Sequence, residues 1–148
     1  MSAPTPIQIA AFLKRYSPHW RNTPRERLVP VVEWYHRDAR VGVLRSGGNI
    51  VAVALARAMH STDEADTPYH HDESGKIVWI DNIVSRHPEG ISQLLSMAMR
   101  RFGPREAFAG HVFNRAGQLR MLPWKTVERL ASVPQHHVHQ RTGSATAA

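Results

Sequence analysis

The residue that most clearly could take part in chemistry is Asp81, a carboxylate in the middle of the apolar stretch Lys76-Ile-Val-Trp-Ile-Asp-Asn-Ile-Val84. An ionised acid is not buried in apolar surroundings unless it has a hydrogen-bonding partner or a shifted pKa. Asp81 is therefore either a functional acid or a structural one that caps backbone amides or pairs with an arginine such as Arg57. The adjacent Asn82 offers an amide donor to a carbonyl oxygen, or a structural hydrogen bond.

Histidines and acids gather in two segments that resemble metal-binding tracts. The ligand types are right for zinc, because imidazoles and carboxylates bind it well. Neither segment has the helical or strand spacing that orients ligands, so we expect no native metal site. The residues concerned are His60, Asp63, His70, His71 and Asp72 in one segment and His136, His137 and His139 in the other.

The net charge of +7 is unevenly spread along the chain. Residues 1–57 carry 9 Lys/Arg against 3 acids, residues 76–148 carry 10 against 4, and residues 58–75 hold five acids and no base. The alternatives are a solvated surface and a polyanionic partner, such as nucleic acid, an acidic carrier protein or a phosphorylated cofactor. The candidate basic surface comprises Arg100, Arg101, Arg105, Arg115, Arg120, Lys125 and Arg129.

Length and composition favour one cytoplasmic domain. A chain of 148 residues is long enough to bury a core, and none of its apolar runs reaches the ~18 residues of a membrane span. The absence of cysteine excludes disulfides and thiolate chemistry. We expect a folded domain over residues 1–131 and a flexible, histidine-rich tail over residues 132–148.

The first half of the chain predicts two helices and a hairpin. A capping box at Thr5 begins a helix that ends before Ser17-Pro18, and a second capping box at Thr23 begins another that Pro30 interrupts or kinks. Residues 40–45 and 49–57 are apolar runs separated by Ser-Gly-Gly, the chemistry of a tight hairpin. Residues 60–74 are predicted to form a long polar loop.

The second half predicts a central strand followed by a helix. Residues 77–84 form the strand, with positions 77, 79, 81 and 83 on one face and 78, 80, 82 and 84 on the other. An amphipathic helix follows, and Gly103-Pro104 ends it. Further strands are expected over residues 106–113 and 118–122, with a last helix from Pro123. This order is typical of a mixed α/β sheet flanked by helices.

The order of elements resembles the GNAT acyltransferase fold, which implies a single-domain α/β protein with a mostly antiparallel sheet. In that fold a loop with the motif Arg/Gln-x-x-Gly-x-Gly/Ala receives the cofactor pyrophosphate at a helix N-terminus. The corresponding segment here, His87-Pro-Glu-Gly-Ile-Ser92, keeps the middle glycine and differs at its first and last positions. The resemblance implies a donor site at Val84, Gly90, Ile91 and Ser92.

A narrower resemblance is to the toxin-activating lysine acyltransferases, which take fatty acyl groups from acyl carrier protein. It rests on Trp79-Ile-Asp-Asn-Ile83, on Arg100-Arg-Phe102, and on Ser17-Pro-His-Trp-Arg-Asn22, which is similar to the family's Ser-Pro-x-His-Arg-Asn segment. This resemblance implies that His19 and Asp81 are catalytic. An imidazole would take the proton of the acceptor ammonium group while the carboxylate orients the ring.

Two classes of function are left open. One is a GNAT-like acyltransferase that moves an acyl group to an amine, such as a protein lysine, from acyl carrier protein or acyl-CoA. The other is a catalytically inactive GNAT-like fold that binds protein or nucleic acid, for example as a phage or virion-associated component. The Trp-Ile-Asp strand favours the first class. The altered loop favours the second, because Glu89 offsets the helix dipole that attracts a phosphate.

Overall fold

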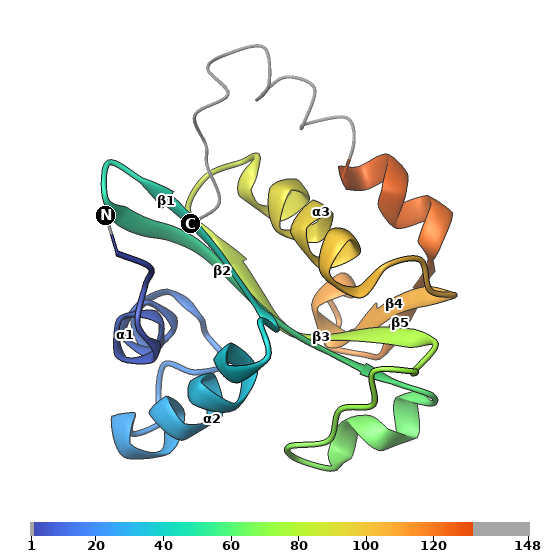
Figure 1. The fold of residues 1–148 in the computed structure, drawn as a ribbon, viewed down its shortest axis with the longest axis horizontal. Coiled ribbons are helices and arrows are strands. Elements are labelled where there is room, and N and C mark those ends of the chain that lie inside the picture. Colours follow the sequence, from blue (N-terminus) through green and yellow to red (C-terminus); the bar gives the residue numbers. More distant parts are fainter. Residues whose placement is uncertain (1, 132–148) are drawn as a thin grey trace.

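A five-stranded sheet separates two layers of helices in the computed structural model, which describes residues 2–131 (Figure 1). The strands lie in the order β1-β2-β3-β4-β5, and every neighbouring pair is antiparallel except β3 and β4. The predicted mixed, mostly antiparallel sheet is thus confirmed. The strands are β1 (Val41–Ser46), β2 (Asn49–Met59), β3 (Ile77–Ser85), β4 (Ala107–Gly110) and β5 (Arg120–Pro123).

One face of the sheet is covered by α1 (Pro6–Tyr16) and α2 (Arg25–Arg37). The capping box predicted for α1 is present, because Thr5 Oγ1 accepts from the Gln8 amide at 3.2 Å and Gln8 Oε1 accepts from the Thr5 amide at 2.9 Å. Ile9 and Leu13 are fully buried on this face. These two residues lie one helical turn apart, so the apolar face of α1 is the face that packs on the sheet.

The start of α2 differs from the prediction, and the first of the two outcomes expected at Pro30, an interruption, does not occur. Pro24 is the N-cap and no side chain caps the helix, so the capping box expected at Thr23 is wrong. Pro30 does not interrupt the helix, which runs from Arg25 to Arg37. Pro30 and Glu26 are exposed, so water can solvate the carbonyl that a proline leaves without its N–H partner.

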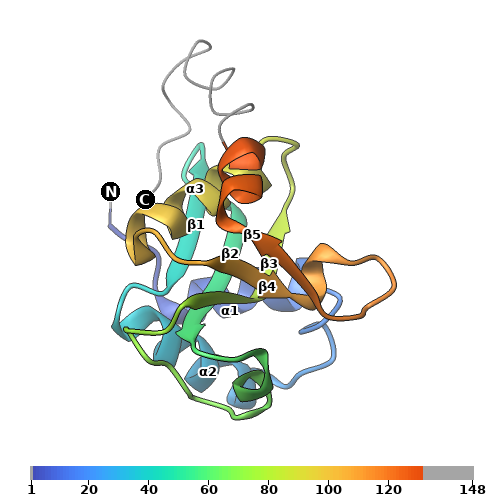
Figure 2. The same ribbon diagram turned by 90° about the vertical axis from the view of Figure 1, so that its right-hand side faces the viewer.

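The opposite face is covered by α3 (Gly90–Phe102) and by a helical segment over residues 124–131 (Figure 2). Leu95 and Phe102 pack there with Val78, Phe108 and Val127 in one buried cluster. Gly103 ends α3 with a φ of 74°, a left-handed conformation that glycine adopts without steric cost. Both the helix and its glycine stop agree with the sequence prediction.

One loop is more ordered than expected, and one strand is shorter than expected. The polar segment 60–74 contains a 3-10 helix, η1 (Thr62–Asp66), with a capping box between Ser61 and Glu64. The strand predicted over residues 106–113 ends at Gly110 and passes into a second 3-10 helix, η2 (His111–Phe113). There His111 Nδ1 donates a hydrogen bond at 2.9 Å to the Gly117 carbonyl, because a carbonyl oxygen can only accept.

Glu73 ties the segment that follows η1 to the C-terminal end of α3. Its carboxylate accepts hydrogen bonds from Arg101 at 3.0 Å and from Arg105 at 3.2 Å. The hydrogen bond from Arg101, reinforced by His71, lowers the pKa of Glu73 to about 2. More than half of the Glu73 side chain is exposed, so solvent screens this ion pair.

The substitution Glu73→Gln should therefore cost about 0.5 kcal/mol of stability at neutral pH, as exposed ion pairs do. A carboxyl pKa lowered by folding stabilises the protein above the unfolded value near 4.5, and that contribution is lost as the pH falls toward about 2. Urea unfolding at pH 7 and at pH 2 measures the stability with the ion pair present and with its contribution lost. The exposed Glu33→Gln is the matched control, and a Glu73→Gln deficit that persisted at pH 2 would contradict this assignment.

Candidate functional site

Asp81 is the extra residue of a β-bulge in β3. Leu55 of β2 pairs with Asn82 and the next residue, Ala56, pairs with Ile80, so Asp81 has no partner in the register. A bulge breaks the alternation of side chains along a strand. Asn82 and Val84 consequently lie on the α1 and α2 side with Asp81, and their predicted placement with residues 78 and 80 is wrong.

Four hydrogen bonds converge on the Asp81 carboxylate. Oδ1 accepts from Trp79 Nε1 at 3.0 Å and from Arg57 Nη2 at 3.3 Å, and Oδ2 accepts from Arg57 Nε at 2.9 Å and from the Tyr35 hydroxyl. Burial, reinforced by the charge of Asp81, raises the pKa of Tyr35, so the phenol remains a donor. The pairing with Arg57 that the sequence left open is present.

Arg57 joins this carboxylate to the segment between β2 and β3. Its side chain is 4% exposed. Nη1 donates to the carbonyls of Thr67 at 2.8 Å and His70 at 3.2 Å, and Nη2 donates to that of Ala65 at 2.6 Å. The Asp81–Arg57 pair thus holds together α2, two strands and the polar loop, which is a structural role.

The turn after α1 meets β3 beside Asp81. Ser17 Oγ donates to Asn82 Oδ1 at 2.7 Å, and both residues are buried. Asn82 Nδ2 and Trp20 Nε1 are also buried, and neither has a hydrogen-bond partner among residues 2–131. A buried donor without a partner is costly, so these two nitrogens are candidates to bind a ligand oxygen.

His19 lies in the same turn and is exposed. Its ring meets the Trp20 ring edge-on, with centroids 4.6 Å apart. Within the described chain, no hydrogen bond or ion pair joins His19 to Asp81. The structure therefore places His19 in the segment that contacts Asn82, while the oxygens of Asp81 are held by other residues.

One edge of β3 is open beyond its third residue. The parallel pairing with β4 covers only Ile77 to Trp79, and within the described residues no strand pairs with residues 80–85 on that side. Gly110 ends β4 against this strand, where a Cβ would lie 2.7 Å from the Ile80 carbonyl oxygen. The free edge begins next to Asp81 and leads to the start of α3.

The first turn of α3 presents backbone donors at the end of this edge. The amide of Gly90 bonds to the His87 carbonyl at 3.1 Å, and that of Gln93 bonds to the Glu89 carbonyl at 3.2 Å. The intervening amides, of Ile91 and Ser92, precede the first hydrogen bond of the helix ladder. Ile91 is exposed, whereas Ser92 is buried, with its hydroxyl donating to the Glu89 carbonyl at 2.9 Å.

Gly90 is required by packing, whatever the loop binds. A Cβ at this position would lie 1.8 Å from Ser85 Oγ and 2.7 Å from Ser85 Cβ. The side chain of Val84, the fourth predicted donor residue, packs with the core under α1 and α2. Sequence reasoning missed Arg86, an exposed cation whose guanidinium lies 4.7 Å from the Tyr16 ring centroid beside this loop.

We expect Gly90→Ala to destabilise the fold by about 1–3 kcal/mol through overpacking. The double variant Gly90→Ala/Ser85→Gly should lose less than the sum of the two single variants, because removing the Ser85 side chain removes both clashing atoms. Urea midpoints of all three variants measure this coupling. Strictly additive losses would show that the clash is relieved elsewhere.

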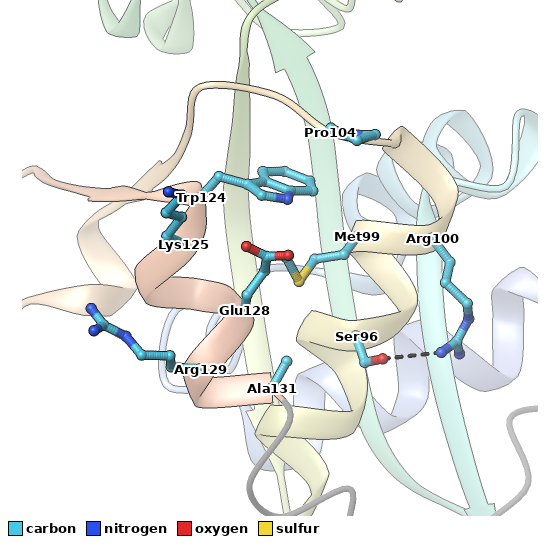
Figure 3. A pocket seen from close by; sticks show the side chains of 9 residues that line it. All are labelled: Ser96, Met99, Arg100, Pro104, Trp124, Lys125, Glu128, Arg129 and Ala131. Atoms are coloured by element: carbon cyan, nitrogen blue, oxygen red, sulfur yellow. Dashed lines mark hydrogen bonds between the residues drawn. The ribbon is translucent and has the colours of Figure 1, made fainter.

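A separate cleft of about 810 Å³ lies between α3 and residues 124–131 (Figure 3). Met99 and Trp124 face it, while Lys125 and Arg129 extend from the outer side of the helical segment. Arg100 points away and donates to Ser96 Oγ at 3.0 Å. Arg101 and Arg105, two of the seven predicted basic residues, are engaged with Glu73.

The histidines of the polar segment pair with separate carboxylates. His60 contacts Asp72 at 3.1 Å and His70 contacts Glu64 at 2.5 Å. In the described part of the chain no group of three or more such side chains could hold a metal ion. The second candidate tract, residues 136–139, and the predicted tail lie outside the described residues.

No helix within residues 2–131 has both the length and the apolarity to cross a bilayer.

The fold is GNAT-like, as the order of elements predicted. A solved structure described as the GphF GNAT-like decarboxylase in complex with isobutyryl-CoA matches with a TM-score of 0.54 and 17% sequence identity. The match covers 80% of this chain and 76% of that chain. Family models and curated proteins gave no match to the sequence. At this identity the likeness concerns the fold alone.

Proposed function

We propose that the protein is a GNAT-type acyltransferase that uses acyl-CoA and acylates an amine. The observation that supports it most directly is the open edge of β3, which runs from the Asp81 bulge to the free amides of α3. An extended acyl thioester arm can hydrogen-bond along such an edge, as peptides do when they add to a sheet. The amides of Ile91 and Ser92 then face the phosphates.

The reacting carbonyl belongs beside the bulge, where the unpartnered Asn82 Nδ2 supplies a donor to its oxygen. The acceptor nitrogen attacks the thioester carbon, a C–N bond forms, and the C–S bond breaks to release the thiol. His19, in the adjacent turn, takes the proton that the amine loses and gives it to the leaving sulfur, which departs as the thiol. Asp81 takes no proton and has a positioning role, because its hydrogen bonds hold Trp79 and Tyr35 around the bulge. A protein lysine is the acceptor that the toxin-activating resemblance suggests.

A non-catalytic GNAT-like binding module is the second candidate. It is favoured by the saturation of Asp81, because each of its oxygens already accepts two hydrogen bonds and has no capacity to act as a base. The altered donor loop, with Glu89 as the N-cap of α3, points the same way. Protein or nucleic acid would be the partner of such a module.

Calorimetric titration with three probes separates these candidates: isobutyryl-CoA, acyl carrier protein loaded with the same isobutyryl group, and duplex DNA. We expect isobutyryl-CoA to bind. We also expect Glu89→Gln to strengthen this binding about two- to fivefold, because it removes a negative charge from the helix N-terminus. Glu128→Gln, the same change on another helix, should have no effect. Binding of DNA alone, with affinity that falls steeply with salt, would reject the enzyme.

A further inference from the structure

A cavity of about 230 Å³ lies between the first two strands and the C-terminal half of α3, on a different face of α3 from the cleft in Figure 3. Small residues create it: Gly42, Ala54 and Ala56 line the sheet side where larger side chains would fill the space. Leu94, Met97 and Phe102 form the helix side. The lining is mainly apolar and excludes most polar ligands.

Arg40 lines one end of this cavity, and its side chain is only 2% exposed. Nη2 donates to the Trp34 carbonyl at 2.9 Å and to Asp38 Oδ2 at 3.3 Å, and the guanidinium stacks 3.8 Å from the Trp34 ring centroid. Nε and Nη1 are buried and have no hydrogen-bond partner among residues 2–131. A buried guanidinium stays charged at neutral pH, so its two unmatched donors call for an acceptor.

The carboxylates near Arg40 leave Nε and Nη1 of its guanidinium without an acceptor. Arg101 also lines the cavity, and Arg105 lies in the loop that follows α3. The two nearby carboxylates are occupied: Asp38 accepts from Arg40 Nη2, and Glu73 accepts from Arg101 and Arg105. Neither acid accepts a hydrogen bond from Arg40 Nε or Nη1, so an added carboxylate would find two unmatched donors there.

We propose that this cavity binds a short-chain aliphatic monocarboxylate, with the carboxylate at Arg40 and the chain between Ala54 and Leu94. The apolar lining suits a hydrocarbon chain, and Arg40 supplies the charged donors that a carboxylate prefers. The volume is below the ~300–1,000 Å³ of pockets for drug-sized ligands, so the chain must be short. The cavity is separate from the β3 edge, so this proposal stands independently of the proposed acyl transfer.

Titration of the full chain with sodium hexanoate, 1-hexanol and inorganic phosphate tests the proposal by calorimetry and amide chemical shifts. Hexanoate should bind saturably at one site, at least about tenfold more tightly than 1-hexanol, because a hydrogen bond to a charged group is worth roughly that factor. Phosphate should not bind. The largest amide shift changes should occur at the residues of β1, β2 and α3 that line the cavity.

Two variants locate the ligand. Arg40→Gln should weaken hexanoate binding at least about tenfold, whereas Arg45→Gln, the same change within β1, should leave it unchanged. Ala54→Val, which fills the cavity and keeps Arg40, should abolish binding and decides the question even where Arg40→Gln fails to fold. Absence of saturable hexanoate binding, equal binding of 1-hexanol, tighter binding of phosphate, or full affinity in Ala54→Val would each overturn the proposal.

Discussion

The substitution Asp81→Asn should lower the free energy of unfolding by about 3 kcal/mol, the low end of the range for breaking a buried ion pair. The variant leaves the Arg57 guanidinium charged and 4% exposed, without the carboxylate that accepts from its Nε and Nη2. The low end applies because Asp81 itself keeps a fifth of its side-chain surface exposed. Urea unfolding at neutral pH, followed by tryptophan fluorescence, measures the loss.

Asp66→Asn is the matched control, since it makes the same change at an exposed position of η1. Its effect should stay within about 0.5 kcal/mol, as for surface substitutions away from special features. Combining Asp81→Asn with Arg57→Met should cost less than the sum of the two single changes, because no unpaired charge remains. An Asp81→Asn protein as stable as wild type would show that the carboxylate is free for another role.

The sequence predicted that Asp81 needs a partner because charge burial is a local argument that depends only on residue type and hydrophobic context. Arg57 was named as one candidate partner, and the β2–β3 pairing brings the two together. Trp79 and Tyr35 were not predicted as donors. Tyr35 is 46 residues away in sequence and reaches Asp81 only because α2 packs across the sheet.

The bulge at Asp81 could not be read from the strand pattern. Residues 77–84 are apolar on both alternating faces, so a shift of one position changes little in the hydrophobic pattern. The shift is visible only in the register against β2. Its consequence is functional, because it moves Asn82 onto the face where the turn containing Ser17 lies.

The errors in the loops have local causes. Ser61 and Glu64 have the spacing of a capping box, a signal in the sequence that the polar composition of residues 60–74 obscured. The end of β4 at Gly110 has no comparable signal, since it depends on the close approach of Gly110 to the Ile80 carbonyl. Packing between distant segments therefore determines where β4 ends and how much of the β3 edge stays open. The proposed donor site depends on that open edge.

The second large effect concerns His19. In the proposed enzyme, His19→Gln should reduce acyl transfer from isobutyryl-CoA to a lysine-containing peptide by about 10²–10⁴-fold, the usual contribution of a general base. The side chain is exposed, so the unfolding midpoint should not change. Thiol release during steady-state turnover measures the rate, and titration with isobutyryl-CoA should show unchanged donor affinity.

His36→Gln serves as the control, because His36 is also exposed but lies near the end of α2. It should retain the wild-type rate. A drop confined to kcat in His19→Gln fits proton transfer, whereas a drop confined to KM for the peptide fits acceptor binding by the turn. Wild-type turnover in His19→Gln would assign the proton to another group. The acyl transfer itself would still stand, because it is measured in the unmodified protein.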